Sequence, residues 1–204
     1  MKKILLISLV MLLAVSVSFS QFGIKAGINL ATVSGADKSL GGIDPTHKLG
    51  LAGGISYRIG LIAGLAIQPE VMYIQKGAIY DGNMSIQGFS ISGKTTLSGN
   101  YIDIPVLVKF NLPIPVFSPY IEGGVSYGIL LSAKEKTEAG GQSNETDIKD
   151  QLTKSDVSLI FGVGVEFLIL EIDARMVLGQ TKLGKDSDAK VFNNGIIFTA
   201  GLRF

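Results

Sequence analysis

Charged residues recur at every second position inside apolar stretches of this 204-residue chain, a spacing that puts their chemistry on one face of a strand. Between positions 170 and 176, Glu171, Asp173 and Arg175 alternate with aliphatic residues and a methionine. A carboxylate or guanidinium on an enclosed face must be paired or solvated. The pattern therefore predicts an inward face whose charges form salt bridges, line a polar pore or perform acid–base catalysis.

The same alternation extends this inward face along the chain. It contains six acids and five bases: Lys25, Arg58, Glu70, Asp103, Lys109, Glu122, Glu166, Glu171, Asp173, Arg175 and Arg203. Because positive and negative charges are nearly balanced, we expect them to form salt bridges that largely fill the enclosed space. A narrow pore or a catalytic site is less favoured. Because the guanidinium of Arg175 can hold carboxylates in two directions, we expect it to reach Glu70 or Asp103. Lys25 would replace it if the strands are staggered differently.

Other chemistry-bearing patterns are weaker. His47 is the only histidine, with Ser34, Ser39 and Asp44 nearby, and a lipid-modifying enzyme could use such groups. A catalytic base needs its nucleophile and orienting acid in contact, and no recognised spacing indicates that arrangement. Cysteine is absent, which excludes disulfides and thiolate metal sites. We expect no catalytic residues, no metal and no cofactor.

Period-two segments predict eight strands. They lie at 22–33, 47–59, 61–76, 95–110, 117–132, 155–167, 169–182 and 191–204. Their connections alternate: long at 34–46, 77–94 and 133–154, intermediate at 183–190, and short at Gly60, 111–116 and Leu168. This alternation predicts an all-β fold, an eight-stranded antiparallel up-and-down transmembrane β-barrel. The charged loop 133–154 is interpreted as a mobile surface loop or an adhesion surface.

Steric crowding assigns the two faces of the barrel. Charges and most glycines share one face of each strand, while bulky apolar residues occupy the other. The concave side of an eight-stranded barrel is barely wide enough for its own side chains, so the glycine-rich, charged face should point inward. A soluble ligand-binding barrel would carry its large apolar residues inside instead.

The ends of the chain fit export and membrane insertion. Lys2 and Lys3 precede an apolar run at 4–17 and then Ser18 and Ser20, which predicts a cleaved signal peptide at 1–20 and a barrel domain at 21–204. The alternative, an uncleaved anchor helix, would be shorter than the roughly 20 residues that span a bilayer. The terminal strand ends in Phe204, as the closing strand of an outer-membrane barrel often does.

The composition of the chain limits the classes of partner that it is expected to bind. The formal net charge is +1, which argues against nucleic acid. No stretch after residue 20 runs 18 apolar residues without a charge, so transmembrane helices are not expected, although the mean hydropathy is positive at +0.41. We expect an integral protein of the bacterial outer membrane with both termini in the periplasm. Its expected partners are outer-membrane lipid, the barrel-assembly machinery at the C-terminal strand, and secretion or envelope proteins.

Three segments resemble a known family. They are 22–30 (FGIKAGINL), 67–77 (IQPEVMYIQKG) and 101–110 (YIDIPVLVKF), and in this order they resemble the PorT-like outer-membrane barrels, which are similar in architecture to the OmpA transmembrane domain. The namesake of that family is linked to protein secretion across the outer membrane, and the resemblance transfers no catalytic residue. It implies either a non-enzymatic structural or interaction role, or an accessory role in secretion or as a small pore.

Aromatic residues at strand ends complete the expectations. Rings are favoured at the lipid–water boundary. We expect a periplasmic aromatic girdle made of Phe22, Tyr57, Phe110, Phe117, Phe167 and Phe204. Tyr73 and Tyr127 should belong to a sparser girdle at the outer boundary.

Overall fold

The computed structural model describes residues 21–39, 42–62, 64–86, 89–112, 114, 116–185 and 189–204. The proposed signal peptide at 1–20 lies outside these residues. The described part contains strands β1 (Phe22–Ser34), β2 (Lys48–Tyr57), β3 (Ile59–Gly60), β4 (Leu65–Ile86), β5 (Phe89–Asn111), β6 (Phe117–Ala139), β7 (Gln142–Asp147), β8 (Ser155–Phe167), β9 (Leu170–Lys182) and β10 (Phe192–Arg203), and the 3-10 helix η1 (Lys149–Gln151).

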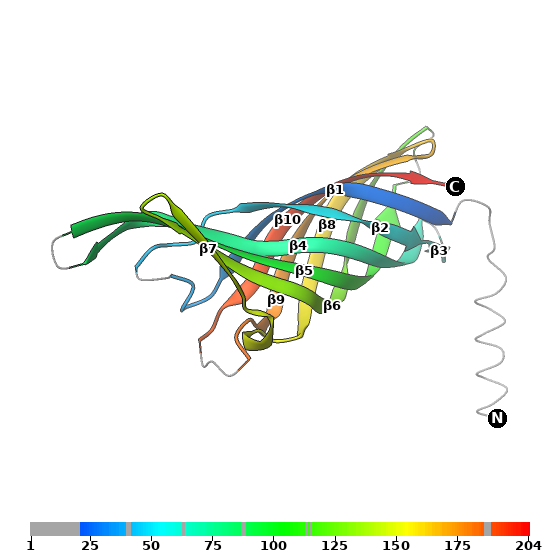
Figure 1. Ribbon diagram of the computed structural model, residues 1–204. Helices are drawn as coiled ribbons and strands as arrows, with labels where there is room; N and C mark the ends of the chain where they lie inside the picture. The colour runs from blue at the N-terminus through cyan, green and yellow to red at the C-terminus, as the bar shows by residue number, and fades with distance from the viewer. Residues whose placement is uncertain are drawn as a thin grey trace, which may run out of the picture.

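Eight long strands close into a barrel (Figure 1). Neighbours pair in the order β2-β1-β10-β9-β8-β6-β5-β4, and β2 pairs with β4 to complete the ring. Every pairing is antiparallel, and β1 and β10 are held at their ends by two bonds between the backbones of Phe22 and Phe204, at 3.2 and 2.9 Å. The predicted all-β, eight-stranded up-and-down barrel is confirmed.

The two ends of the barrel differ. The end called the turn end carries Gln21, Phe204 and the short connections around 58–64, 112–116 and 168–169. At the opposite end, called the ribbon end, strands β4, β5 and β6 run far beyond their neighbours (Figure 1). Both termini of the described chain therefore lie with the short connections.

The structure corrects the first short connection. The expected tight turn at Gly60 is wrong, because Ile59 and Gly60 form β3 and pair with Ile67 and Ala66. The chain reverses after Leu61, whose amide donates to the carbonyl of Leu65 at 2.8 Å. Apolar alternation continues through this hairpin, so the sequence alone placed the reversal too early.

The expected long loops at 77–94 and 133–154 are also corrected. β4 and β5 remain paired as far as Ile86 and Phe89, and β6 continues to Ala139 before β7 folds back against it. Gly140 and Gly141 both have positive φ (58° and 79°), as a two-residue hairpin turn requires. The sequence predicts loops here because these polar strands lack apolar alternation. We call the extension formed by 77–86, 89–99, 133–139 and 142–147 the ribbon.

A register shift marks where barrel becomes ribbon. Asn100 pairs with Ser132 but Tyr101 pairs with Leu130, so Leu131 is an extra residue in β6. A β-bulge bends a strand and increases its local twist. The bulge thus lets β5 and β6 leave the barrel wall without ending.

Candidate functional site

Arg175 lies at the centre of the lumen. Its side chain projects inward from β9, and its guanidinium contacts Glu70 on β4 at 2.5 and 2.9 Å and Glu122 on β6 at 2.6 Å. A third carboxylate, Asp173, lies 3.1 Å from its Nε. Of the two partners that the sequence offered for Arg175, the structure selects Glu70. The contact ties walls on opposite sides of the barrel together.

Two lysines extend this cluster toward the turn end. The Lys25 ammonium lies 2.6 Å from Glu171, 3.0 Å from Asp173 and 3.3 Å from Glu70. Lys109 contacts Glu171 at 2.7 Å and Glu166 at 2.9 Å. Every one of these side chains is almost completely buried. A buried charge with several partners on different strands is costly to disturb.

Tyr120 supports the same cluster. Its hydroxyl donates to Glu171 at 2.9 Å, and the Lys109 ammonium lies 3.5 Å from the centre of its ring. The ring lies against Gly164 on the neighbouring strand, where a Cβ atom would overlap it. Glycine on the inward face here makes room for a lumenal aromatic side chain.

Glu166 is the shared partner of the basic side chains at the turn end. Arg58 contacts it at 3.0 Å and Arg203 at 2.8 Å, and Arg58 also donates to the amide oxygen of Asn111. Within the described residues, ten of the eleven charges assigned to the inward face are thereby linked through shared partners into one network. The eleventh, Asp103, lies apart from it.

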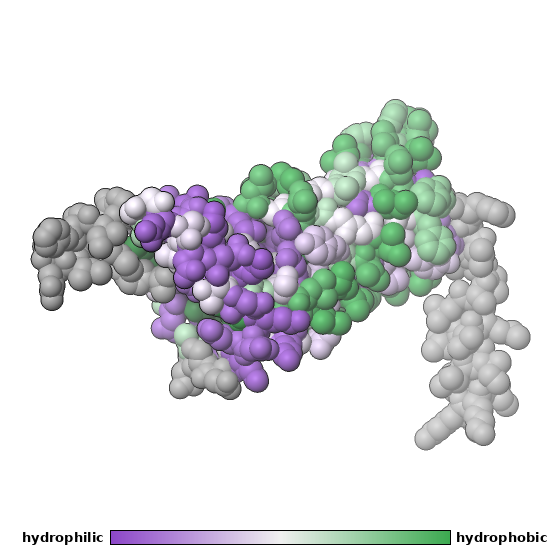
Figure 2. Space-filling model, viewed as in Figure 1, coloured by the Kyte–Doolittle hydropathy of each residue, from purple (hydrophilic) through white to green (hydrophobic). Residues whose placement is uncertain are grey.

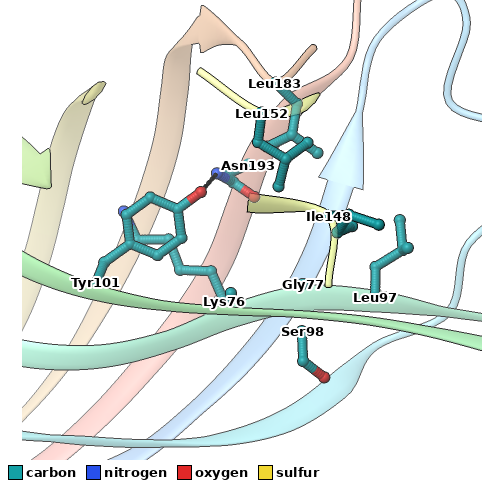
Figure 3. Close-up of a pocket in the computed structure, with 10 residues that line it drawn as sticks. Lys76, Gly77, Leu97, Ser98, Tyr101, Ile148, Leu152, Leu183 and Asn193 are labelled. Carbon is teal, nitrogen blue, oxygen red and sulfur yellow. Dashed lines mark hydrogen bonds between the residues drawn. The ribbon is translucent and has the colours of Figure 1, made fainter. Parts of the chain in front are cut away.

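Asp103 belongs to a second cluster that the sequence reasoning missed. Lys76 lies 2.9 Å from Asp103 and 2.9 Å from Asp156, and Asn193 donates to Asp156 at 3.1 Å. Lys76 and Asp156 share the inward parity of their strands, so extending the alternation to the strand ends would have found them. Figure 3 shows Lys76 beside Tyr101, whose hydroxyl accepts a hydrogen bond from Asn193 at 3.4 Å.

An apolar layer separates the two clusters. It consists of Ala52, Met72, Ile74, Leu107, Ile160, Val177 and Ile197. Along β4, Met72 and Ile74 lie between Glu70 of the first cluster and Lys76 of the second. Two small cavities lie on the ribbon-end side of this layer. One, of about 30 Å³, lies between Tyr101, Leu97 and Ile148 (Figure 3). The other, of about 10 Å³, lies beside Asn29. These volumes suit single water molecules.

Large apolar side chains cover the outside of the barrel. On β1 the outward residues from Phe22 to Leu30 are apolar or alanine, and the other barrel strands follow the same alternation. At the tilt of an eight-stranded barrel this corresponds to a belt roughly 20–25 Å high. Figure 2 shows the belt covering the turn-end half, while the ribbon-end half is hydrophilic.

The family model of the outer membrane protein β-barrel domain matches residues 15–184. The chain belongs to this family. It is therefore an integral outer-membrane protein, and its apolar belt contacts lipid. No helix in the described part of the chain is long and apolar enough to cross a membrane.

Solved structures of similar shape come from several bacteria. The attachment invasion locus protein Ail of Yersinia pestis, in complex with the heparin analogue sucrose octasulfate, is 20% identical over 92% of this chain and 100% of that chain, with a TM-score of 0.42. Neisserial surface protein A is 13% identical over 90% and 97%, with a TM-score of 0.47. Outer membrane protein W of E. coli is 13% identical over 92% and 100%, with a TM-score of 0.42. No curated protein matches the chain.

The six aromatic residues expected at the turn end all lie on the outside of this outer-membrane barrel. Phe22 and Tyr57 pack edge to face with ring centres 4.9 Å apart. Phe110, Phe117, Phe167 and Phe204 are all exposed. Tyr73 and Tyr127 are exposed nearer the ribbon end, where Tyr73 donates to Asn100 at 2.9 Å.

His47 has no catalytic neighbours among the described residues. The Ser39 hydroxyl donates to Asp44 at 2.6 Å, so serine and acid contact each other and not the histidine. This hydrogen bond lowers the pKa of the Asp44 carboxyl. His47 itself is exposed beside the start of β2. The geometry therefore provides no serine–histidine–acid arrangement there.

The ribbon presents charged pairs to solvent. Lys134 contacts Glu145 at 2.5 Å across β6 and β7, and Lys136 contacts Glu138 at 2.6 Å. Hydrogen bonding to Glu145 raises the pKa of Lys134 above its ordinary value. Such exposed pairs add little stability. Their main consequence is a mixed-charge surface held on a regular β-scaffold.

Proposed function

We propose that this outer-membrane barrel is closed and non-enzymatic and acts through an interaction surface, the ribbon. The observation that carries the proposal is the contrast between lumen and ribbon. Two buried charge clusters and an apolar layer fill the lumen, whereas β4 to β7 extend a charged sheet beyond the membrane belt. In this proposal the ribbon faces the cell exterior, the turn end faces the periplasm, and residues 1–20 are a signal peptide removed on export.

The aromatic residues support this orientation. A girdle of Phe22, Tyr57, Phe110, Phe117, Phe167 and Phe204 would hold the turn end at the inner boundary of the membrane. The eleven inward charges would act as structural ties that block the lumen.

The first prediction concerns conductance. Purified barrel inserted in planar bilayers should give no stable ion current, because the Arg175 contacts with Glu70 and Glu122 cross the lumen. The double variant Arg175→Ala and Glu70→Ala, which removes the bridge, is the matched comparison. Reproducible open-channel steps from the wild-type protein would contradict a closed barrel.

A second candidate function is an accessory role in secretion. The PorT-like resemblance suggests it, and one structural observation favours it. Aliphatic side chains at the turn end are exposed beyond the aromatic ring positions, among them Ile62 (76%), Val116 (66%) and Leu168 (70%). A periplasmic protein could dock on such residues.

The second prediction separates the two candidates by crosslinking in intact cells. In one variant residues 134–147 are replaced by Asn-Gly, which keeps the backbone bond from Ile148 to Ala133 and hence the barrel rim. In the other, Ile62 and Ile169 are changed to serine. If the ribbon is the working surface, crosslinked proteins are lost only from the first variant. Loss only from the second would favour the secretion role, and unchanged crosslinks in the first would show that the charged β6–β7 half of the ribbon is not the working surface.

A further inference from the structure

Among the described residues, the second lumenal cluster contains one more carboxylate than it contains cations. Its single cation, Lys76, contacts Oδ2 of Asp103 and Oδ2 of Asp156, each at 2.9 Å. Asn193 adds a hydrogen bond to the same Oδ2 of Asp156. Two carboxylates therefore share one ammonium group in a region where all three side chains are at least 94% buried. An unbalanced charge at that depth is expensive unless another group neutralises it.

Four buried oxygen atoms near this cluster lack hydrogen-bond partners within the described structure. They are Oδ1 of Asp103, Oδ1 of Asp156, Oγ of Ser126 and Oγ of Ser158. Ser158 is fully buried and Ser126 is 2% exposed. Buried polar atoms without partners are rare in native proteins and indicate a ligand or ordered water.

These four residues occupy one continuous patch of the lumen wall. Asp103 pairs with Gly128 and Gly128 with Asp156, so the three form a row across β5, β6 and β8. One step toward the turn end, Ser126 pairs with Ser158. The Ser126 hydroxyl lies within hydrogen-bonding reach of the Asp103 carboxyl, although its Oγ atom makes no well-aligned hydrogen bond.

Gly128 makes room for the carboxyl group of Asp103 in this row. A Cβ atom at this position would lie 2.6 Å from Oδ1 of Asp103, so the Asp103 side chain leans over the glycine toward Asp156. A cavity of about 10 Å³ adjoins Asp103 and Lys76 and has room for one water molecule.

We propose that Asp103, Asp156, Ser126 and Ser158 bind a small monovalent cation, with sodium as the ion of matching chemistry. Carboxylate and hydroxyl oxygens are the ligands that hard cations prefer. One positive charge balances the surplus of one carboxylate, whereas a divalent ion would replace it with a positive surplus. Water alone would satisfy the hydrogen bonds and leave the charge unbalanced. A proton held by one of the two carboxylates would also balance it, and in that case the protein would melt at the same temperature in sodium and in N-methylglucamine. This site is independent of the ribbon.

The third prediction tests the site by thermal melting of the full chain, refolded in detergent. Unfolding is compared in sodium chloride and in N-methylglucamine chloride at equal ionic strength. An ion that binds only the folded state raises the melting temperature as its concentration rises, so the wild type should melt higher in sodium. Asp156→Asn removes the surplus charge and should abolish the difference. Asp147→Asn, on the ribbon, should keep it.

A second, milder variant controls for the possibility that Asp156→Asn fails to fold. Ser158→Ala keeps the charges and the shape of the wall, and should weaken the apparent sodium affinity by about tenfold. Equal melting of the wild type in the two salts would overturn the proposal, as would a sodium effect that survives Asp156→Asn. In crystals grown with thallium(I), an anomalous peak beside Asp103 and Asp156 would support it, and ordinary water density there would refute it.

Discussion

Replacing Arg175 with methionine is expected to lower the melting temperature of the refolded barrel far more than replacing Lys136 with methionine. Arg175 is the shared partner of Glu70 and Glu122, and its removal leaves buried carboxylates without their main counter-charge. Breaking a buried pair in this way typically costs about 3–5 kcal/mol. Lys136 is exposed and its pair with Glu138 is solvated. Thermal unfolding in detergent, followed by circular dichroism, measures both variants.

A second pair of variants shows whether charge or packing is responsible. Adding Glu70→Gln to Arg175→Met removes one of the stranded carboxylates, so the double variant should recover part of the lost stability. If Arg175→Met and Lys136→Met unfold within error of the wild type, the bridge contributes nothing to the folded state.

Deleting Phe204 is expected to reduce the amount of folded barrel in the outer membrane several-fold. Phe204 exchanges two backbone hydrogen bonds with Phe22 where β10 meets β1, and its ring lies exposed at the lipid-facing rim. Without it the last pairing of the ring is lost, together with the apolar end that we expect the assembly machinery to recognise. Heat-modifiable mobility of the protein in outer-membrane fractions measures the folded amount, and aggregated or degraded chain should accumulate in the periplasm.

Two controls accompany the deletion. Phe204→Tyr keeps an aromatic ring at the rim and should assemble normally. Arg203→Met should be milder than the deletion, because Glu166 retains Arg58 and Lys109 as partners. Normal assembly of the chain without Phe204 would remove the reason for assigning the C-terminal strand a role in insertion.

The sequence was most informative where one face of a strand meets lipid. On β9, Glu171, Asp173 and Arg175 alternate strictly with apolar residues, so strand, inward face and charge could all be assigned from spacing. The same rule gave the ring of eight strands. This prediction needed only the alternation of apolar and polar residues at every second position and the steric crowding on the concave side of the barrel.

The alternation was uninformative where both faces of a strand meet water. Residues such as Lys134, Lys136 and Glu138 lie on a regular strand of the ribbon, but charges at successive exposed positions look like a loop. Their strand structure comes from pairing with β5 and β7, which no local pattern records. Only the second lumenal cluster was missed. Parity places Lys76 and Asp156 on the inward face, but their contact depends on the stagger of β4 against β8, which no local pattern records.

The bulge at Leu131 and the unbroken course of β4, β5 and β6 give the ribbon a mechanical property. Eleven residues of β5 (89–99) extend beyond Asn100, a reach of roughly 37 Å, whereas the headgroup region adds only about 5–8 Å to the hydrocarbon core. A partner attached at the far end would therefore pull on the strands well outside the membrane. Because the ladder hydrogen bonds run perpendicular to the strands, tension along the strands would load them together rather than one after another, and the same backbones would carry it into the barrel wall. Force on the ribbon is thus transmitted directly to the membrane anchor.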